Sequence, residues 1–113
     1  MHALIIEDDS LIALLIEDML REVGYTSFAF AVSADGAVAA AAERRPDLIT
    51  ADVRLEPGSG IDAVDRIREE QEIPVVFVTA TSSEVRERQD GAIVVQKPFA
   101  AIDLKAAVFA ARA

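Results

Sequence analysis

The sequence predicts a doubly wound α/β fold, in which helices cover both faces of a five-stranded parallel sheet. Five short apolar runs alternate along the chain with segments of helical pattern, and strand–helix–strand connections make successive strands parallel. Of the 113 residues, 52% are apolar and 27% are charged, which is typical of a folded chain. That length suits one domain, so we expect residues 1–113 to form a single unit.

The five apolar runs are short and continuous, as in strands that are buried on both faces. The first of them, ALII, is followed by three acids, and IPVVFVTA is the most strand-like segment of the chain. We expect strands at residues 3–6, 26–32, 47–53, 73–80 and 92–96.

The segments between these runs carry helix signals. In the first, Ile12, Ile16 and Met19 recur at helical spacing and Gly24 ends the pattern, while Pro46 stops an alanine-rich second segment. We expect helices at residues 10–23, 33–45, 61–71, 82–90 and 100–113, of which the fourth, SSEVRERQD, is short and polar.

Charge and composition exclude several classes of partner. Eleven Lys and Arg against twenty Asp and Glu give a net charge of −9, which opposes binding to nucleic acid or to anionic lipid. The chain has no cysteine, no basic segment leading into a signal-like apolar run, and no apolar stretch of about 18 residues. We therefore expect a cytoplasmic protein without disulfides, a membrane span or direct contact with nucleic acid.

Polar residues follow four of the predicted strands, at the sheet edge where open α/β sheets bind ligands. Neighbouring acids repel each other by about 4 kcal/mol per pair at about 4 Å and an effective dielectric constant of about 20. A lysine and a hard cation, Mg²⁺ held by one or two carboxylates and waters, would compensate. The residues are Glu7, Asp8 and Asp9 after the first strand, Asp52 after the third, Thr79 at the end of the fourth and Lys97 after the fifth.

These groups suit phosphoryl transfer. A carboxylate can attack a phosphoryl group to form an acyl phosphate. A metal ion and an ammonium group stabilise the charge that develops on the phosphoryl oxygens, and a hydroxyl can donate a hydrogen bond to one of them.

Four motifs in order, IIEDD, ADVRLEPGSG, FVTA and QKPF, make the chain resemble the CheY-like receiver domains of bacterial response regulators over almost its whole length. The resemblance implies strand order 2-1-3-4-5 and a cis peptide bond between Lys97 and Pro98. It also implies a sensor histidine kinase or a histidine phosphotransfer protein as the phosphodonor, and self-catalysed phosphorylation and hydrolysis rather than an enzyme acting on other substrates.

The resemblance also assigns roles to individual residues. It makes Asp52 the phosphoacceptor, and it makes Thr79 and Lys97 the hydroxyl and ammonium groups that contact the phosphoryl group. The implied Mg²⁺ ligands are the carboxylates of Glu7, Asp8 and Asp52 and the backbone carbonyl of Arg54.

Three features depart from the family pattern. Pro57 lies one position later than in the common Leu-Pro form of the loop after Asp52. Val94 stands where receivers usually carry a rotating Tyr or Phe, so that aromatic switch is absent. The span from Thr79 to Lys97 is about one helical turn shorter than in the family, which indicates a different output.

Apolar residues outside the core pattern suggest contact surfaces. In the last helix Leu104 and Val108 share one face, whereas Ile102 and Phe109 lie nearly opposite, which predicts either a homodimer or partner surface or cover by neighbouring elements. The first helix has a similar excess, Leu11 and Leu14, in the region where phosphodonors dock on receivers. We expect His2 to face solvent, and Tyr25 and Phe99 to be packing residues.

Two alternatives remain beside the receiver reading. A phosphatase or phosphotransferase of the haloacid-dehalogenase type also uses a strand-end Asp, but it needs an acid two residues later, where this chain has Arg54. A pseudo-receiver would bind partners without phosphorylation; the full set of site residues argues against it, whereas Val94 leaves room for it. The sequence does not distinguish a stand-alone regulator from part of a longer protein.

Overall fold

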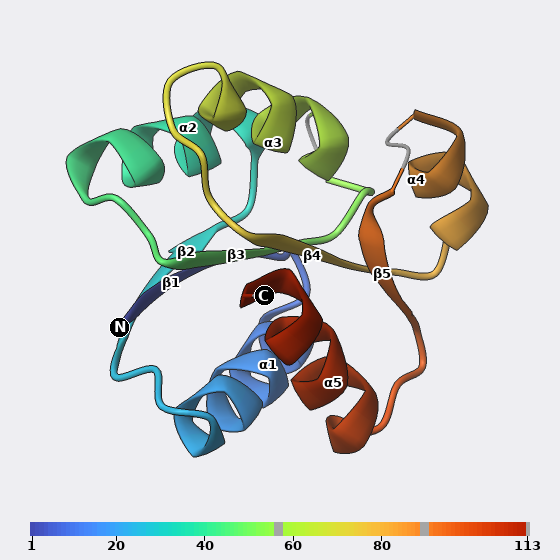
Figure 1. Ribbon diagram of the computed structural model, residues 1–113. Coiled ribbons are helices and arrows are strands. Elements are labelled where there is room, and N and C mark those ends of the chain that lie inside the picture. The colour runs from blue at the N-terminus through green and yellow to red at the C-terminus, as the bar shows by residue number, and fades with distance from the viewer. Residues whose placement is uncertain (56–57, 89–90, 113) are drawn as a thin grey trace.

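A computed structural model describes residues 1–55, 58–88 and 91–112 and shows three layers, with one sheet between two layers of helices (Figure 1). The strands are parallel and lie in the order β2-β1-β3-β4-β5, as the family resemblance implied. Their bounds are β1 His2–Ile6, β2 Ser27–Ala31, β3 Leu48–Ala51, β4 Val75–Thr79 and β5 Ile93–Gln96.

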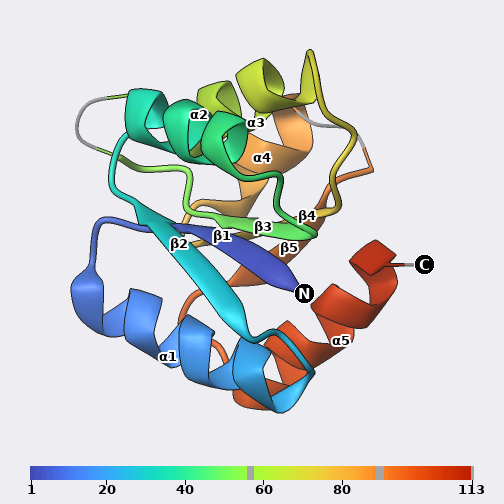
Figure 2. The ribbon, with the colours of Figure 1, turned by 90° about the vertical axis from the view of Figure 1, so that its left-hand side faces the viewer.

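Helices α1 and α5 cover one face of the sheet, and α2, α3 and α4 lie on the other (Figures 1 and 2). This is the doubly wound arrangement that the alternating pattern predicts. The helices are α1 Ser10–Glu22, α2 Ala34–Glu43, α3 Gly60–Arg68, α4 Ser82–Arg88 and α5 Ala101–Arg112.

The predicted elements are all present, and most are shorter than expected. Strand β4 begins at Val75 and not at Ile73, because Pro74 has no N–H to donate to the ladder. Helix α3 begins at Gly60, where the Ser59 hydroxyl caps it by accepting from Asp62 N. Helix α4 has seven residues, in line with the short fourth helix expected from the sequence.

Each face of the sheet contributes one half of the core. Side chains of β1, β3 and β4 alternate between the two clusters, so Leu4 and Ile6 pack toward α2 and α3 while Ala3 and Ile5 pack toward α1 and α5. Every residue of β1 and β4 is buried. The central strands are therefore held rigidly, and the residues that follow them are held with them.

His2 is buried, which contradicts the expectation that it faces solvent. Strand β1 has a neighbour on each side, so even its first residue is covered, and His2 is 5% exposed. Its Nδ1 lies 2.9 Å from Ser27 Oγ, and its backbone N–H donates to Asp47 Oδ2 at 2.7 Å. Because His2 is next to the chain end, its position in the chain gave no sign that it lies inside the sheet.

Tyr25, Phe99 and Val94 all pack in or against the core. Tyr25 is buried in the core, and Phe99, which is partly exposed, packs against the core cluster that contains Tyr25. The Lys97–Pro98 bond is cis. Val94 is partly buried against the α2–α3 side, whereas Pro57 lies outside the described residues.

Helix α5 buries one apolar stripe and exposes the other. Leu104 and Val108 are fully buried, whereas Ile102 is 75% exposed and Phe109 is 60% exposed. Neighbouring elements in the described chain thus leave the second stripe uncovered. Among the described residues, no helix is both long enough and apolar enough to span a bilayer.

Candidate functional site

Four segments that are distant in sequence meet at the carboxyl edge of the sheet. Glu7, Asp52 and Lys97 each follow a strand directly, and Thr79 ends β4. Backbone hydrogen bonds continue past the strand ends: Asp52 N donates to Ile6 O and Lys97 N donates to Thr79 O, both at 2.9 Å. Parallel pairing in register therefore brings these residues to one edge of the sheet, where Glu7, Asp52 and Lys97 meet in a crevice and Thr79 ends the neighbouring strand.

Lys97 joins the two buried carboxylates of this crevice. Its Nζ donates to Glu7 Oε1 at 2.7 Å and to Asp52 Oδ2 at 2.9 Å. The side chains of Glu7, Asp52 and Lys97 are 1%, 10% and 15% exposed, so water screens these ion pairs poorly. One ammonium group thus pairs with two carboxyl groups, and the buried group carries a net negative charge when both are ionised.

Asp8 adds a third carboxylate at the crevice mouth. One carboxylate oxygen from each of Glu7, Asp8 and Asp52 lies within 4.8 Å of the others, an acidic cluster with the donor type that hard cations prefer. Asp9 has a different role, because its Oδ1 accepts from Leu11 N and Ile12 N and so caps α1. The structure thereby separates the three consecutive acids into two ligand candidates and one helix cap.

Burial raises the pKa of Glu7 to about 7, although the hydrogen bonds from Lys97 Nζ and from the Asp9 backbone N–H act in the opposite direction. For Lys97, burial alone would lower the pKa, but its hydrogen bonds to Glu7 and Asp52 outweigh burial and raise it. Lys97 therefore stays charged. A further cation beside Glu7 would favour its ionised form.

Arg54 and Gly60 fix the loop that carries Asp52. Arg54 N donates to Asp52 Oδ1 at 3.3 Å, and Arg54 pairs with Ser59 in an isolated bridge. Gly60 N donates to Val53 O at 2.9 Å, and a Cβ on Gly60 would lie only 2.7 Å from the Asp52 carbonyl carbon. Only glycine allows α3 to begin so close to the backbone of Asp52.

Two residues at this edge escaped the sequence reasoning. Thr81 contacts the buried Thr79 hydroxyl, and Gln96 Nε2 donates to the carbonyls of Ala80 and Lys97. The pattern Thr-x-Thr at a strand end was the available signal for Thr81. Gln96 ends β5 with its amide bridging two loops, and no sequence pattern marks that contact.

Apolar grooves flank the crevice on both sides of α1. One is lined on the β2 side by Leu14, Phe30 and Val32 and reaches Glu7 and Asp8. The other is lined by Leu15, Met19 and Phe99 and reaches Lys97. The exposed leucines that the sequence singled out on the first helix, Leu11 and Leu14, are 66% and 55% exposed.

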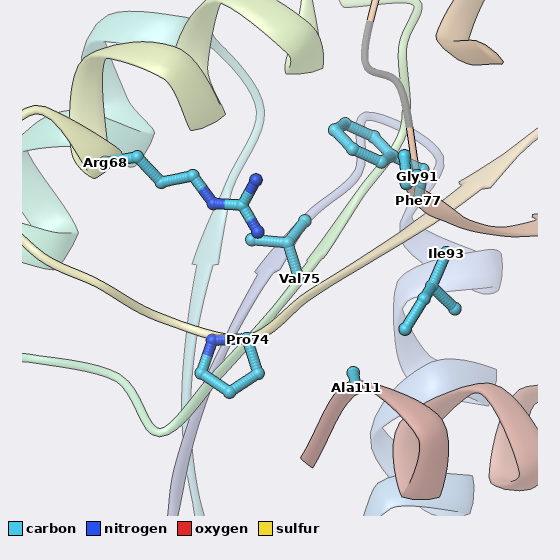
Figure 3. Close-up of a pocket in the computed structure, with 8 residues that line it drawn as sticks. Arg68, Pro74, Val75, Phe77, Gly91, Ile93 and Ala111 are labelled. Carbon is cyan, nitrogen blue, oxygen red and sulfur yellow. The ribbon is translucent and has the colours of Figure 1, made fainter. Parts of the chain in front are cut away.

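Another hollow, of about 150 Å³, lies at the opposite end of the sheet (Figure 3). Arg68 of α3 reaches over it toward Val75 at the start of β4, with Ile93 and Ala111 on the other side (Figure 3). The strands separate this hollow from the acidic cluster, and the cluster residues do not line it.

The fold and the acidic edge of the sheet are together those of a receiver domain, a class of signalling domain. The chain belongs to the response regulator receiver domain family, whose family model matches residues 3–109. Members of this family act in two-component signalling as regulators through contacts with partner proteins.

Known relatives agree with this assignment. The chain is 38% identical to the phyllosphere-induced regulator PhyR of Methylorubrum extorquens, covering 93% of this chain and 41% of PhyR. It is 38% identical to the transcriptional regulatory protein PdtaR of Mycobacterium tuberculosis, covering 95% of this chain and 54% of PdtaR. The chain thus spans about half the length of these curated relatives.

A solved structure shows the same fold. The receiver domain of the Erythrobacter litoralis PhyR response regulator superposes with a TM-score of 0.90 at 34% identity, covering 97% of this chain and 88% of that domain.

Proposed function

We propose that residues 1–113 form a receiver domain in which Asp52 accepts a phosphoryl group. The observation that carries this proposal is the ion pair of Lys97 with both Glu7 and Asp52 beside the three-carboxylate cluster. An ammonium group beside a carboxylate can stabilise charge on the oxygens of an incoming phosphoryl group.

In the proposed step, an Asp52 carboxylate oxygen attacks the phosphorus atom of a phosphohistidine. The P–N bond breaks as the new P–O bond forms, and the imidazole leaves with the electron pair of the broken bond and takes up a proton. Lys97 lies 2.9 Å from Asp52 Oδ2, so its ammonium can move to a phosphoryl oxygen without leaving the crevice. Hydrolysis by water returns Asp52 to its free state.

The acidic cluster fits a magnesium ion. Three carboxylates within 4.8 Å supply oxygen ligands, and burial of Glu7, which raises its pKa, is a cost that a bound cation would offset. The residues that would hold the ion are Glu7, Asp8 and Asp52, with the backbone carbonyl of Arg54. When bound, Mg²⁺ would neutralise charge on the phosphoryl oxygens.

The proposed phosphodonor is a sensor histidine kinase or a histidine phosphotransfer protein in the cytoplasm. The apolar grooves on both sides of α1 reach the crevice, so a helical partner bound there would bring its phosphohistidine close to Asp52. Strong apolar surface beside a charged crevice suits a protein partner better than nucleic acid, given the net charge of −9.

For the output, we propose contacts that differ from those of aromatic-switch receivers, since Val94 has no ring to rotate. The exposed stripe of Ile102 and Phe109 on α5 supports self-association or binding of a downstream protein. The same departure favours the pseudo-receiver as the second candidate function.

The proposal is tested by incubation with Mg²⁺ and acetyl phosphate, followed by intact mass. We expect one phosphoryl adduct on the wild-type protein and none on Asp52→Ala. Asp18→Ala removes an exposed carboxylate on α1 and serves as the matched control, which should keep the adduct. Absence of an adduct on the wild-type protein would favour the pseudo-receiver, and an adduct that persists in Asp52→Ala would exclude Asp52 as the acceptor.

A further inference from the structure

The Thr79 hydroxyl has Thr81 as its partner in the described chain. Thr81 N donates to Thr79 Oγ1 at 3.1 Å, and the two hydroxyl oxygens lie 3.0 Å apart. Thr79 is 1% exposed, whereas Thr81 is half-buried. Thr79 is therefore shielded from water, whereas Thr81, two residues later, is only partly shielded.

The geometry of the two hydroxyls allows either one to donate, and counting donors and acceptors favours Thr79 as the donor. A threonine hydroxyl has one proton to donate and two lone pairs. Thr79 Oγ1 already accepts from Thr81 N, and a buried hydroxyl proton needs an acceptor. Among the described residues, the acceptor beside this hydroxyl is Thr81 Oγ1 at 3.0 Å, which favours donation of the Thr79 proton to Thr81.

The backbone around this pair is held in place. Thr79 O accepts from Lys97 N at 2.9 Å, and Ala80 O accepts from Gln96 Nε2 at 3.0 Å. Thr81 O accepts from Glu84 N at 3.1 Å in the first turn of α4. These contacts hold the chain path from β4 to α4, and a hydroxyl proton can change its acceptor without moving that path.

We propose that Thr81 is a positioning residue whose hydroxyl accepts the Thr79 proton in the unphosphorylated protein and loses it to the phosphoryl group on Asp52. The inference rests on the proposed phosphorylation of Asp52. After the exchange, the half-exposed Thr81 hydroxyl can turn to water or donate back to Thr79 Oγ1. The contact therefore stabilises the unphosphorylated state and opposes the phosphorylated one.

The direction of the effect follows from the cost of an unsatisfied donor. Thr81→Val keeps the shape and the backbone N–H but removes the acceptor, which leaves the buried Thr79 proton without a partner in the unphosphorylated state. In the phosphorylated state this proton has a phosphoryl oxygen, and Thr79 Oγ1 still accepts from the backbone. Thr81→Val should therefore shift the balance toward the phosphorylated state.

The test uses beryllofluoride with Mg²⁺ as a phosphoryl mimic, titrated by calorimetry into the wild-type protein, Thr81→Val and Thr81→Ser. We expect Thr81→Val to bind beryllofluoride about 2- to 10-fold more tightly, the range of one net hydrogen bond. Thr81→Ser keeps the hydroxyl and should restore the wild-type affinity. Affinity for Mg²⁺ alone should be unchanged, because the Thr79–Thr81 pair lies outside the acidic cluster.

Thr81→Ala provides a second hydroxyl-free variant if Thr81→Val does not fold by circular dichroism. If the wild-type protein binds beryllofluoride and the hydroxyl-free variant binds it equally or more weakly, the role of Thr81 is overturned while the proposed function stands. If Thr81→Ser behaves like the hydroxyl-free variant, the hydroxyl is not responsible and the inference also fails. If the wild-type protein binds no beryllofluoride and forms no acetyl phosphate adduct, the proposed function fails and this role fails with it.

Discussion

Replacing Gly60 by alanine should disrupt the phosphoacceptor loop, even though Gly60 begins a helix. A Cβ at Gly60 would lie 2.7 Å from the Asp52 carbonyl carbon and closer still to its oxygen, whereas ordinary van der Waals contact begins at 3.4 Å. The carbon alone requires the Asp52 backbone and the start of α3 to separate by about 0.7 Å, and the nearer oxygen requires more than about 1 Å. The atoms in contact are backbone, which cannot turn aside as a flexible side chain can.

Two opposing terms set the size of the effect. Alanine is favoured over glycine by about 1 kcal/mol in a helix interior, which is an upper bound for Gly60 as the first residue of α3. Overpacking a rigid site costs about 1 to 3 kcal/mol, and a backbone clash belongs at the upper end. We therefore expect Gly60→Ala to lower the free energy of unfolding by about 1 to 2 kcal/mol, the difference between these terms.

Function should suffer more than stability, because the displaced atoms adjoin Asp52. Lys97 Nζ lies 2.9 Å from Asp52 Oδ2, and a shift of about 0.7 Å places this contact beyond good hydrogen-bond length. We expect slower uptake of the phosphoryl group from acetyl phosphate and weaker Mg²⁺ binding, measured by intact mass and calorimetry.

Gly36→Ala is the matched control. Gly36 lies on the exposed face of α2, where a Cβ would meet only the Ser33 hydroxyl, at 3.0 Å. This variant should keep wild-type phosphorylation and be equally or more stable in urea. If Gly60→Ala matched Gly36→Ala in urea midpoint and in phosphorylation rate, the close approach of α3 to Asp52 would not constrain the site.

Three further predictions concern charge. Lys97→Met leaves two buried carboxylates without their cation, so the free energy of unfolding, measured with urea in the presence of chelator, should fall by about 3 kcal/mol. Added Mg²⁺ should recover part of this loss. A decrease below about 0.5 kcal/mol would contradict the buried ion pairs. Burial raises the pKa of Glu7 to about 7, and the proposed Mg²⁺ site needs the ionised carboxylate. The affinity for Mg²⁺, measured by calorimetry, should therefore fall as the pH drops below about 7. In Glu7→Gln the affinity should no longer depend on pH in this way. Burial lowers the pKa of His2 below its usual 6.5, so as the pH falls the unfolded chain takes up this proton before the folded protein does. The contribution of His2 to stability is therefore complete above pH 6.5. It is lost as the pH falls from 6.5 toward the pKa of His2 in the folded protein. The difference in unfolding free energy between the wild-type protein and His2→Asn should therefore shrink over that range, and a flat difference would refute the buried neutral state.

Local patterns in the sequence were sufficient for the architecture. Apolar runs of strand length, helical periodicity and Pro or Gly at the boundaries are short-range features, and they placed all ten elements within a few residues. The candidate site followed for a related reason. Parallel strands bring their carboxyl ends to one edge, so polar residues after Ile6, Ala51 and Gln96 had to become neighbours once the strands were recognised.

The tertiary structure decided the burial and the hydrogen-bond partners of individual residues, because these depend on which chain segments lie side by side. His2 is buried because β2 and β3 flank its strand, and a pattern near the chain end carries no information on those neighbours. Among three adjacent acids, capping of α1 assigns Asp9 to the helix and leaves Glu7 and Asp8 beside Asp52. The contact between Thr81 and Thr79 likewise depends on the turn from β4 into α4. The sequence thus determined which groups reach the crevice, and packing determined their partners, because a hydrogen bond requires distances and directions that composition and periodicity do not encode.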